Sequence, residues 1–250
     1  MADETSGLSR SVEDYLKAIY SIGESGAAAS TSAIAEALEV QPASVTGMVK
    51  RLAESGFLEH VPYRGVRLTE GGTREALRIV RRHRILETYL RERLGYRWED
   101  VHDEAERLEH AASDQLIDRM ASALENPSHD PHGAPIPTSS GEVESTGSLT
   151  LAEVSPGEEA VVRAVRDDDS DGLLAVEAAG LLPGARVRVV GRTLAPPVLR
   201  LEVGEDRREG EEGAQGADRP GGNLEVPLSV ARRVYVIFPA PGLEETQEVS

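Results

Sequence analysis

Residues 125–148, ENPSHDPHGAPIPTSSGEVESTGS, separate two stretches of sequence whose apolar residues follow different periods. Before this segment, apolar residues recur at helical spacing, as in Val12, Leu16 and Ile19. After it, short alternating runs are separated by glycine and proline, which is typical of β-strands. A helix and a strand need different apolar periods to bury one face, so the two stretches form separate parts. The sequence therefore predicts a mainly α-helical protein with a small all-β C-terminal domain.

The first part of the chain has the order of elements found in a winged helix. Helical patterns over residues 10–22, 30–40 and 41–56 follow one another, and the last ends in glycine. Two short β-like runs, Phe57–Val61 and Val66–Thr69, flank a turn rich in proline and glycine. This order predicts a winged helix-turn-helix domain.

The segment from Gln41 to Ser55 is the expected recognition helix. Its first two turns would enter the major groove of DNA, where hydroxyl groups bond bases or phosphates and alanine contacts a thymine methyl group. A basic residue at the wing tip would reach the backbone or the minor groove. An ordinary helical hairpin is the alternative, and the appended wing favours DNA binding. The predicted DNA-contacting residues are Gln41, Ala43, Ser44, Thr46, Gly47, Lys50, Arg51 and Arg64.

Two further helices are expected, over Glu70 to Leu94 and Trp98 to Leu124, and they carry an unusual set of histidines and acids. In VHDEAERLEH, four such residues fall at i, i+4, i+7 and i+8, which is one helical face. Imidazole with carboxylate suits Mn, Fe, Co, Ni or Zn. A solvated charged face is the alternative. The candidate metal ligands are His102, Glu106, Glu109 and His110, together with the i, i+4 pair His83 and Glu87 and with Asp14 on the first helix.

The β-rich end contains four alternating runs, EEAVVRAV, ARVRVVGR, VLRLEV and NLEVPL, which predict a small barrel. A polar stretch at residues 204–222 is expected to be a loop between strands. The segment at 141–148 is expected to be a linker, and residues 239–250 a disordered tail.

Composition limits the classes of protein to which the chain can belong. The net charge is −17, and only two of the 27 basic residues are lysines. Either the protein works in concentrated salt, or a GC-rich genome favours arginine over lysine. No cysteine is present, which excludes disulfides and thiolate metal sites. The acidic N-terminus and the lack of long apolar runs predict a cytoplasmic protein without a membrane span. No zincin motif, nucleophile elbow or P-loop occurs, so no enzyme is expected.

Several segments together resemble the DtxR/MntR family of metal-dependent transcriptional repressors. They are VEDYLKAIY, AIAEALEVQPASVTGMVKRLAESGFLEH, YRGVRLTEGG, RRHRILETYL, VHDEAERLEH and DPHGAPIP. LTLAEVSPGEEAVVRAV and GLLPGARVRVV resemble the SH3-like, FeoA-type domain of three-domain members. The resemblance implies a winged-helix domain at 1–75, a helical metal-binding and dimerisation domain at 76–140, and an SH3-like barrel at 149–238.

The resemblance also implies two metal positions per protomer. Its principal ligands fall on Asp14, Glu106, Glu109 and His110. Its second set falls on His83, Glu87 and His102, with an acid from the SH3-like domain, for which Asp169 and Asp171 are the candidates. In manganese-type members the position of His83 joins the principal site instead.

Three positions depart from the patterns of particular members of the family. Lys17 stands where manganese-type two-domain members have a glutamate ligand, so that ligand is missing. Asp14 and Glu106 stand where iron-type members have methionine and cysteine. Hard oxygen ligands at these two positions favour Mn²⁺, with Fe²⁺ as the other choice.

The predicted function is that of a homodimeric repressor of metal-homeostasis genes, activated by a divalent metal. Metal would tie the first helix, through Asp14, to the segment that carries Glu106, Glu109 and His110. Two recognition helices would then read a pseudo-palindromic operator in double-stranded DNA. The alternatives are a winged-helix regulator that senses a non-metal ligand, and a metal-binding protein or metalloenzyme without a role at DNA.

Overall fold

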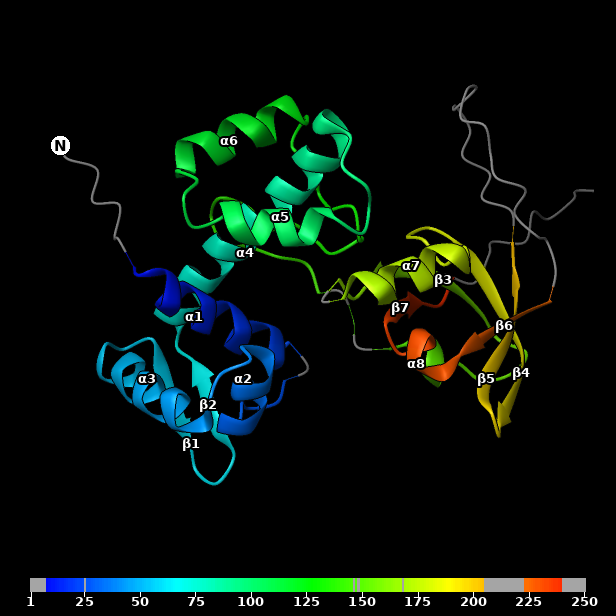
Figure 1. Cartoon of the computed structure of the whole chain (residues 1–250), viewed down its shortest axis with the longest axis horizontal. Coiled ribbons are helices and arrows are strands. Elements are labelled where there is room, and N and C mark those ends of the chain that lie inside the picture. Colours follow the sequence, from blue (N-terminus) through cyan, green and yellow to red (C-terminus); the bar gives the residue numbers. More distant parts are fainter. Residues whose placement is uncertain are drawn as a thin grey trace, which may run out of the picture. The chain divides into compact units, whose positions relative to one another are not determined.

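The computed structural model describes residues 8–24, 26–145, 147, 149–167, 169–204 and 223–239 (Figure 1). The chain folds as two compact units. We call the first, which comprises the described parts of 1–96, 103–128 and 136–144, the helical unit. We call the second, from 97–102, 129–135 and 145–250, the sheet unit. Nearly all of the predicted polar loop and tail lies outside the described residues.

The helical unit begins with the predicted winged helix-turn-helix. Its elements are α1 (Arg10–Gly23), α2 (Thr31–Ala37), α3 (Pro42–Glu54), β1 (Leu58–Val61) and β2 (Gly65–Leu68). The two strands pair antiparallel, with Leu58 opposite Leu68, and form the wing. On α3, Val45, Val49 and Leu52 are buried at i, i+4 and i+7, which leaves the opposite face of this helix exposed.

The wing is held against the start of α2 by a close backbone approach. Ala29 and Val66 exchange two backbone hydrogen bonds, each of 2.9 Å. Gly65 has a φ of 121°, and a Cβ atom there would lie 2.1 Å from the carbonyl oxygen of Ala29. Only glycine fits this position, so the wing is fixed to the body of the domain.

The long helix α4 (Glu70–Leu94) matches its predicted bounds. Thr69 caps its start by accepting a hydrogen bond from the backbone of Gly72, and Gly95 ends it in the left-handed conformation.

The single helix expected over Trp98 to Leu124 is wrong, because two helices occupy this region. They are α5 (Val101–Leu108) and α6 (Asp114–Ala123). The Ser113 hydroxyl accepts a hydrogen bond from the backbone N–H of Leu116 and thereby caps the N-terminus of α6. Arg78 and Arg82 of α4 bind the Asp114 carboxylate in the first turn of α6. Tertiary contacts therefore break a run of residues that has good helical propensity.

The sheet unit is a five-stranded antiparallel sheet with the order β6-β5-β4-β3-β7. The four predicted runs correspond to four of its strands, whereas β7 and the short helices were not predicted. Leu173, Leu181, Leu199 and Leu201 are fully buried in its core. The elements are η1 (Leu151–Glu153), β3 (Glu159–Val165), α7 (Ser170–Ala178), β4 (Arg186–Leu194), β5 (Pro197–Val203), β6 (Asn223–Pro227), α8 (Leu228–Ala231) and β7 (Val234–Ile237).

Two segments from the middle of the chain also belong to the sheet unit. The Trp98 indole N–H donates to the carbonyl of Pro131 at 2.9 Å, and its ring centroid lies 4.9 Å from that of His132. His132 is fully buried, and its Nε2 lies 3.0 Å from the carbonyl oxygen of Trp98. Part of the proline-rich segment is therefore packed structure. Among the described helices, none has both the length and the apolar character needed to cross a bilayer.

Candidate metal centre and DNA-binding face

Charged side chains from α1, α4 and the end of α5 meet inside the helical unit. Asp14 and Lys17 come from α1, and His83 comes from α4. Because α5 ends at Leu108, Glu109 and His110 lie in the turn that follows it, not on the predicted continuous helix. We call this group the acid–histidine cluster; its members are Glu13, Asp14, Lys17, His83, Glu106, Glu109 and His110.

His110 is held between acids on both sides of its ring. Its Nδ1 lies 2.6 Å from Oε2 of Glu13, and its Nε2 lies 2.9 Å from Oδ1 of Asp14 and 3.5 Å from Oε1 of Glu109. Arg82 lies 3.3 Å from the other Glu13 oxygen. When Nδ1 carries the proton it donates to Glu13, and the lone pair of Nε2 then faces Asp14 and Glu109. A histidine that binds metal is commonly oriented by such a carboxylate on its other nitrogen.

These residues fit a divalent metal ion. Asp14, Glu109 and His110 each offer a ligand atom within 4.8 Å of the others. Within the described part of the chain, the buried Nε2 of His110 makes no hydrogen bond, although Asp14 Oδ1 is only 2.9 Å away. The distance is short but the direction is not that of a hydrogen bond, which is the arrangement expected of two ligands aimed at a shared ion. Imidazole nitrogen with carboxylate oxygen suits Mn²⁺ or Fe²⁺.

Lys17 occupies the neighbouring part of the cluster. Its Nζ lies 3.0 Å from His83 Nδ1, 2.5 Å from Glu106 Oε1 and 2.9 Å from Glu109 Oε2. Burial alone would lower the pKa of Lys17, but the negative charges of Glu109 and Glu106 raise it above the ordinary value. The side chain is therefore a cation at neutral pH.

His83 completes this side of the cluster. Its Nδ1 lies 2.6 Å from Glu109 Oε2, and its Nε2 lies 2.9 Å from Glu87 Oε1. Burial alone would lower the pKa of His83, but the carboxylates of Glu87 and Glu109 raise it to about 9. Burial would likewise raise the pKa of Glu109, and the hydrogen bond with His83 and the charge of Lys17 lower it below its usual value. The pKa of Asp14 is raised, chiefly by burial.

Three segments of the chain match family models of metal-dependent repressors. Residues 7–66 match the iron-dependent repressor N-terminal DNA-binding domain, residues 69–138 its metal-binding and dimerisation domain, and residues 149–209 the FeoA domain. The iron-dependent repressor IdeR of Mycobacterium leprae is 33% identical over 189 residues, which cover 71% of this chain and 82% of IdeR. The chain belongs to the DtxR/MntR family.

Other members of the DtxR/MntR family support this conclusion. The regulator MntR of Oceanobacillus iheyensis is 44% identical over 110 residues, which cover 44% of this chain and 74% of MntR. A solved manganese-dependent transcriptional repressor in complex with manganese has a TM-score of 0.79 and 33% identity, and the match covers 91% of this chain and 100% of that one. The resemblance found in the sequence is thus confirmed, as is the fold class.

The metal-ligand candidates implied by the DtxR/MntR resemblance lie in two groups, one in the helical unit and one in the sheet unit. The helical unit brings together Asp14, Glu106, Glu109 and His110, with His83 joining them and Glu87 beside His83. In the sheet unit, Nδ1 of His102 lies 3.6 Å from Oδ2 of Asp167, and that same oxygen lies 3.8 Å from Nδ1 of His132.

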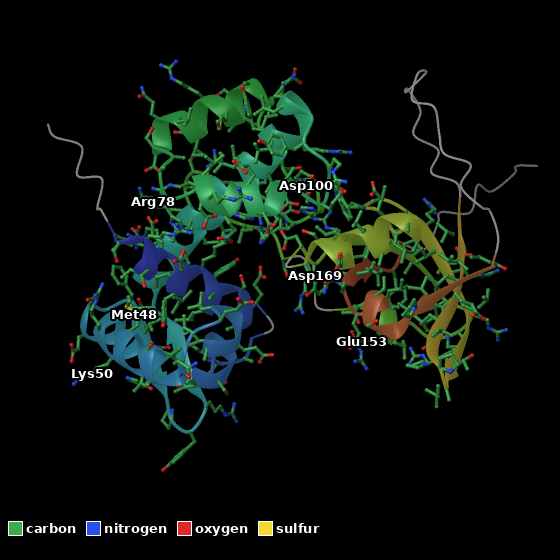
Figure 2. All side chains as sticks on the ribbon, viewed as in Figure 1. Met48, Lys50, Arg78, Asp100, Glu153 and Asp169 are labelled. Carbon is green, nitrogen blue, oxygen red and sulfur yellow. The ribbon has the colours of Figure 1, made fainter. Side chains whose placement is uncertain are left out.

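Asp169 and Asp171, the predicted acids of the SH3-like domain, lie at the start of α7. Asp169 caps α7, accepting hydrogen bonds from the backbone N–H groups of Asp171 and Gly172 (Figure 2). Arg233 lies 3.4 Å from the Asp169 carboxylate, and Asp171 is exposed. In the run RDDDSDG, the acid beside His102 is Asp167. The signal that was overlooked is local, because an aspartate before SDGLL is a typical N-cap.

Two further residues were missed in the sequence. Glu13 was passed over because it precedes Asp14 by one residue, and adjacent residues rarely share a helical face. His132 was missed because it lies in the proline-rich segment 125–148, outside the predicted helices and strands. Both side chains are buried, which their positions in the sequence do not reveal.

The predicted DNA-contacting residues are all exposed, and they lie just before α3, on α3 and in the wing. Gln41 precedes α3, and the other candidates on α3 are exposed, including Lys50 (Figure 2). The hydroxyl of Thr46 donates to the carbonyl of Pro42 at 3.1 Å, so its oxygen remains available as an acceptor. Arg64 is exposed in the turn of the wing beside the fully exposed Tyr63, which the sequence did not single out. The remaining candidates on the exposed face of α3 are Ala43, Ser44, Gly47 and Arg51.

Proposed function

We propose that this DtxR/MntR family member is a homodimeric repressor whose binding to a pseudo-palindromic operator is switched on by Mn²⁺ or Fe²⁺, with Mn²⁺ favoured. One observation carries the proposal. Asp14 lies in the segment that matches the family's DNA-binding domain, whereas Glu109 and His110 lie in the segment that matches its metal-binding and dimerisation domain. Ligands for one ion therefore come from both segments.

The electrostatics of these ligands explain how metal acts as a switch. Two carboxylates about 5 Å apart repel by roughly 3 kcal/mol at an effective dielectric constant of about 20. A divalent ion between Asp14 and Glu109 reverses this repulsion and favours the arrangement in which α1 meets the turn after α5. Metal then shifts the population towards the arrangement it binds more tightly.

The oxygen-rich ligand set supports the choice of metal. Asp14 and Glu109 supply hard oxygen donors and His110 one imidazole nitrogen, which is a set that suits Mn²⁺ or Fe²⁺. A second ion is proposed from the family pattern at His83, Glu87 and His102. For its acid from the SH3-like domain we propose Asp167 in place of Asp169 and Asp171, because Asp167 is the acid beside His102.

For DNA contact we propose the exposed face of α3 and the wing. Ser44 and Thr46 present oxygens to bases or phosphates, and Lys50, Arg51 and Arg64 present cations to phosphates. Two such surfaces in a homodimer would lie on successive major-groove turns of a palindromic site.

Selection from a random pool of duplex DNA, followed by fluorescence anisotropy, tests the proposal. The selected duplex should bind at least about tenfold more tightly with Mn²⁺ or Fe²⁺ than with a chelator, and Mg²⁺ should not substitute. His110→Ala should remove the metal response, while Asp103→Ala, an exposed acid on α5, should retain it. Equal DNA binding with metal and with chelator would favour sensing of a non-metal ligand. Failure to select any duplex would favour a metal-binding protein without a role at DNA.

A further inference from the structure

Two sets of candidate ligands in the helical unit overlap on one residue. Asp14, Glu109 and His110 form one set, and His83, Glu106 and Glu109 form the other. In each set the ligand atoms lie within 4.8 Å of one another. Glu109 is fully buried and directs Oε1 towards His110 and Oε2 towards His83, at 3.5 and 2.6 Å. The geometry is thus that of two adjacent cation positions with a bridging carboxylate.

The second of these positions already contains a cation that belongs to the protein. Lys17 Nζ lies within 3.0 Å of all three members of the second set, namely His83, Glu106 and Glu109. A lysine ammonium has three N–H donors, and Glu106 Oε1 and the two carboxylate oxygens of Glu109 accept from them. Its side chain is only 17% exposed, which leaves it little freedom to withdraw into solvent.

A metal ion cannot share this position with the ammonium. An ion bound by His83, Glu106 and Glu109 would have to lie among the atoms that surround Nζ. Charges of +2 and +1 at about 3 Å repel strongly in a buried site, because Coulomb repulsion varies inversely with distance and little water is present to screen it. The position of Asp14, Glu109 and His110 differs, because Glu109 is the only member of that set for which a contact with Lys17 is described.

We propose that this centre is a mixed pair, in which one divalent ion is held by Asp14, Glu109 and His110 and the Lys17 ammonium permanently takes the place of a second ion. Glu109 bridges the two cations, and Glu106 accepts a hydrogen bond from the ammonium. The inference rests on the proposed metal-dependent function and specifies how many ions this centre takes. Activation at this centre then needs one ion, and its metal dependence shows no cooperativity between paired ions.

Electron paramagnetic resonance of bound Mn²⁺ tests the proposal independently of DNA binding. Two Mn²⁺ ions bridged by one carboxylate are magnetically coupled, whereas separate ions give the hyperfine pattern of isolated Mn²⁺. The wild-type protein at saturating Mn²⁺ should show only isolated ions. An ion at the proposed second set adds another isolated signal and does not alter this result. A coupled spectrum in the wild type would overturn the proposal.

Variants that lack the Lys17 ammonium should give the coupled spectrum that the wild-type protein does not show. Lys17→Glu replaces the ammonium with a ligand, and Lys17→Met only removes it, so both should bind one additional Mn²⁺ and give a coupled spectrum. Lys17→Met covers the case in which the extra carboxylate prevents Lys17→Glu from folding. Lys17→Arg keeps the cation and should behave like the wild type. Isolated spectra from both folded Lys17→Glu and folded Lys17→Met would overturn the proposal.

The same measurement of Mn²⁺ binding to the wild-type protein separates this inference from the proposed function. A wild-type protein that binds no Mn²⁺ at all contradicts the Mn²⁺-favoured form of the proposed function, and the inference falls with it. A wild-type protein that binds a coupled pair leaves the metal-dependent function intact and contradicts the mixed pair alone.

Discussion

Nδ1 of His110 lies 2.6 Å from Oε2 of Glu13, which joins the turn after α5 to the first helix of the winged domain. Arg82 of α4 lies 3.3 Å from the other oxygen of Glu13 and lies beside Asp114 at the start of α6. The ring of His110 is thereby fixed so that Nε2 faces Asp14 and Glu109. Glu13 is therefore a positioning residue for the proposed ligand His110.

Glu13→Ala should weaken Mn²⁺ binding by about 10- to 100-fold, the usual cost of removing the partner that orients a metal-binding histidine. Glu13→Gln keeps an oxygen that accepts from Nδ1, so its loss should be smaller. Competition with a fluorescent chelator measures both affinities, and Glu36→Ala on the exposed face of α2 is the control. Wild-type affinity in Glu13→Ala would show that this contact does not support the centre.

Asp14→Met should weaken the response to Mn²⁺ more than the response to Fe²⁺ or Ni²⁺. A thioether is a softer ligand than a carboxylate, and Mn²⁺ depends more than Fe²⁺ or Ni²⁺ on oxygen donors. Operator binding measured against the free concentration of each metal gives the comparison. Equal losses for all three metals would show that Asp14 does not set the choice of metal.

Asp114→Asn should destabilise the metal-free protein by about 1 kcal/mol near pH 7, a value reduced because the Asp114 side chain is 44% exposed. Burial alone would raise the pKa of Asp114, but the hydrogen bonds from Arg78 and Arg82 lower it below 3.8. A lowered folded-state pKa gives stability that is present above 3.8 and lost as the pH falls through the folded-state value. Urea unfolding should therefore show a difference that shrinks in acid. A difference that is independent of pH would contradict the ionic origin of this stability.

Operator affinity should depend only weakly on salt if the protein works in concentrated salt. The net charge of −17 gives a long-range field that opposes association with DNA, and concentrated salt screens this repulsion. Recognition would then depend on short-range contacts from residues such as Ser44 and Arg64, with a log–log slope well short of about −0.9 per neutralised phosphate for six or more contacts. Titrations of the metal-bound protein from about 0.1 M to above about 2 M KCl measure the slope. Loss of all binding above about 0.5 M would leave genome composition as the explanation of the acid excess.

Most of the helical part of the fold could be predicted from local patterns, because its elements begin and end at residues with strong local effects. Gly56 and Gly95 end helices, and Thr69 caps α4. The break after Leu108 could not be predicted, because AERLEHAASDQL has helical spacing and an alanine-rich composition. That break depends on Asp114 meeting two arginines of α4, which no local pattern reveals.

The candidate site was predictable to a similar degree. The resemblance placed Asp14, Glu109 and His110 together, and the structure brings them together. The contacts of Lys17 depend on the packing of α1 against the end of α5, so the sequence indicated only that one ligand was missing. The sequence did not distinguish Asp167 from Asp169, because acids in a short charged run are equivalent until one of them begins a helix.

The most direct test of the central claim is the affinity for Mn²⁺ measured with and without operator DNA. If metal and DNA favour the same arrangement of α1, the factor by which Mn²⁺ tightens DNA binding must equal the factor by which DNA tightens Mn²⁺ binding. We predict that saturating operator raises the Mn²⁺ affinity by this factor, at least about tenfold, and that His110→Ala removes the effect. An Mn²⁺ affinity that operator DNA leaves unchanged would contradict a metal switch at Asp14, Glu109 and His110.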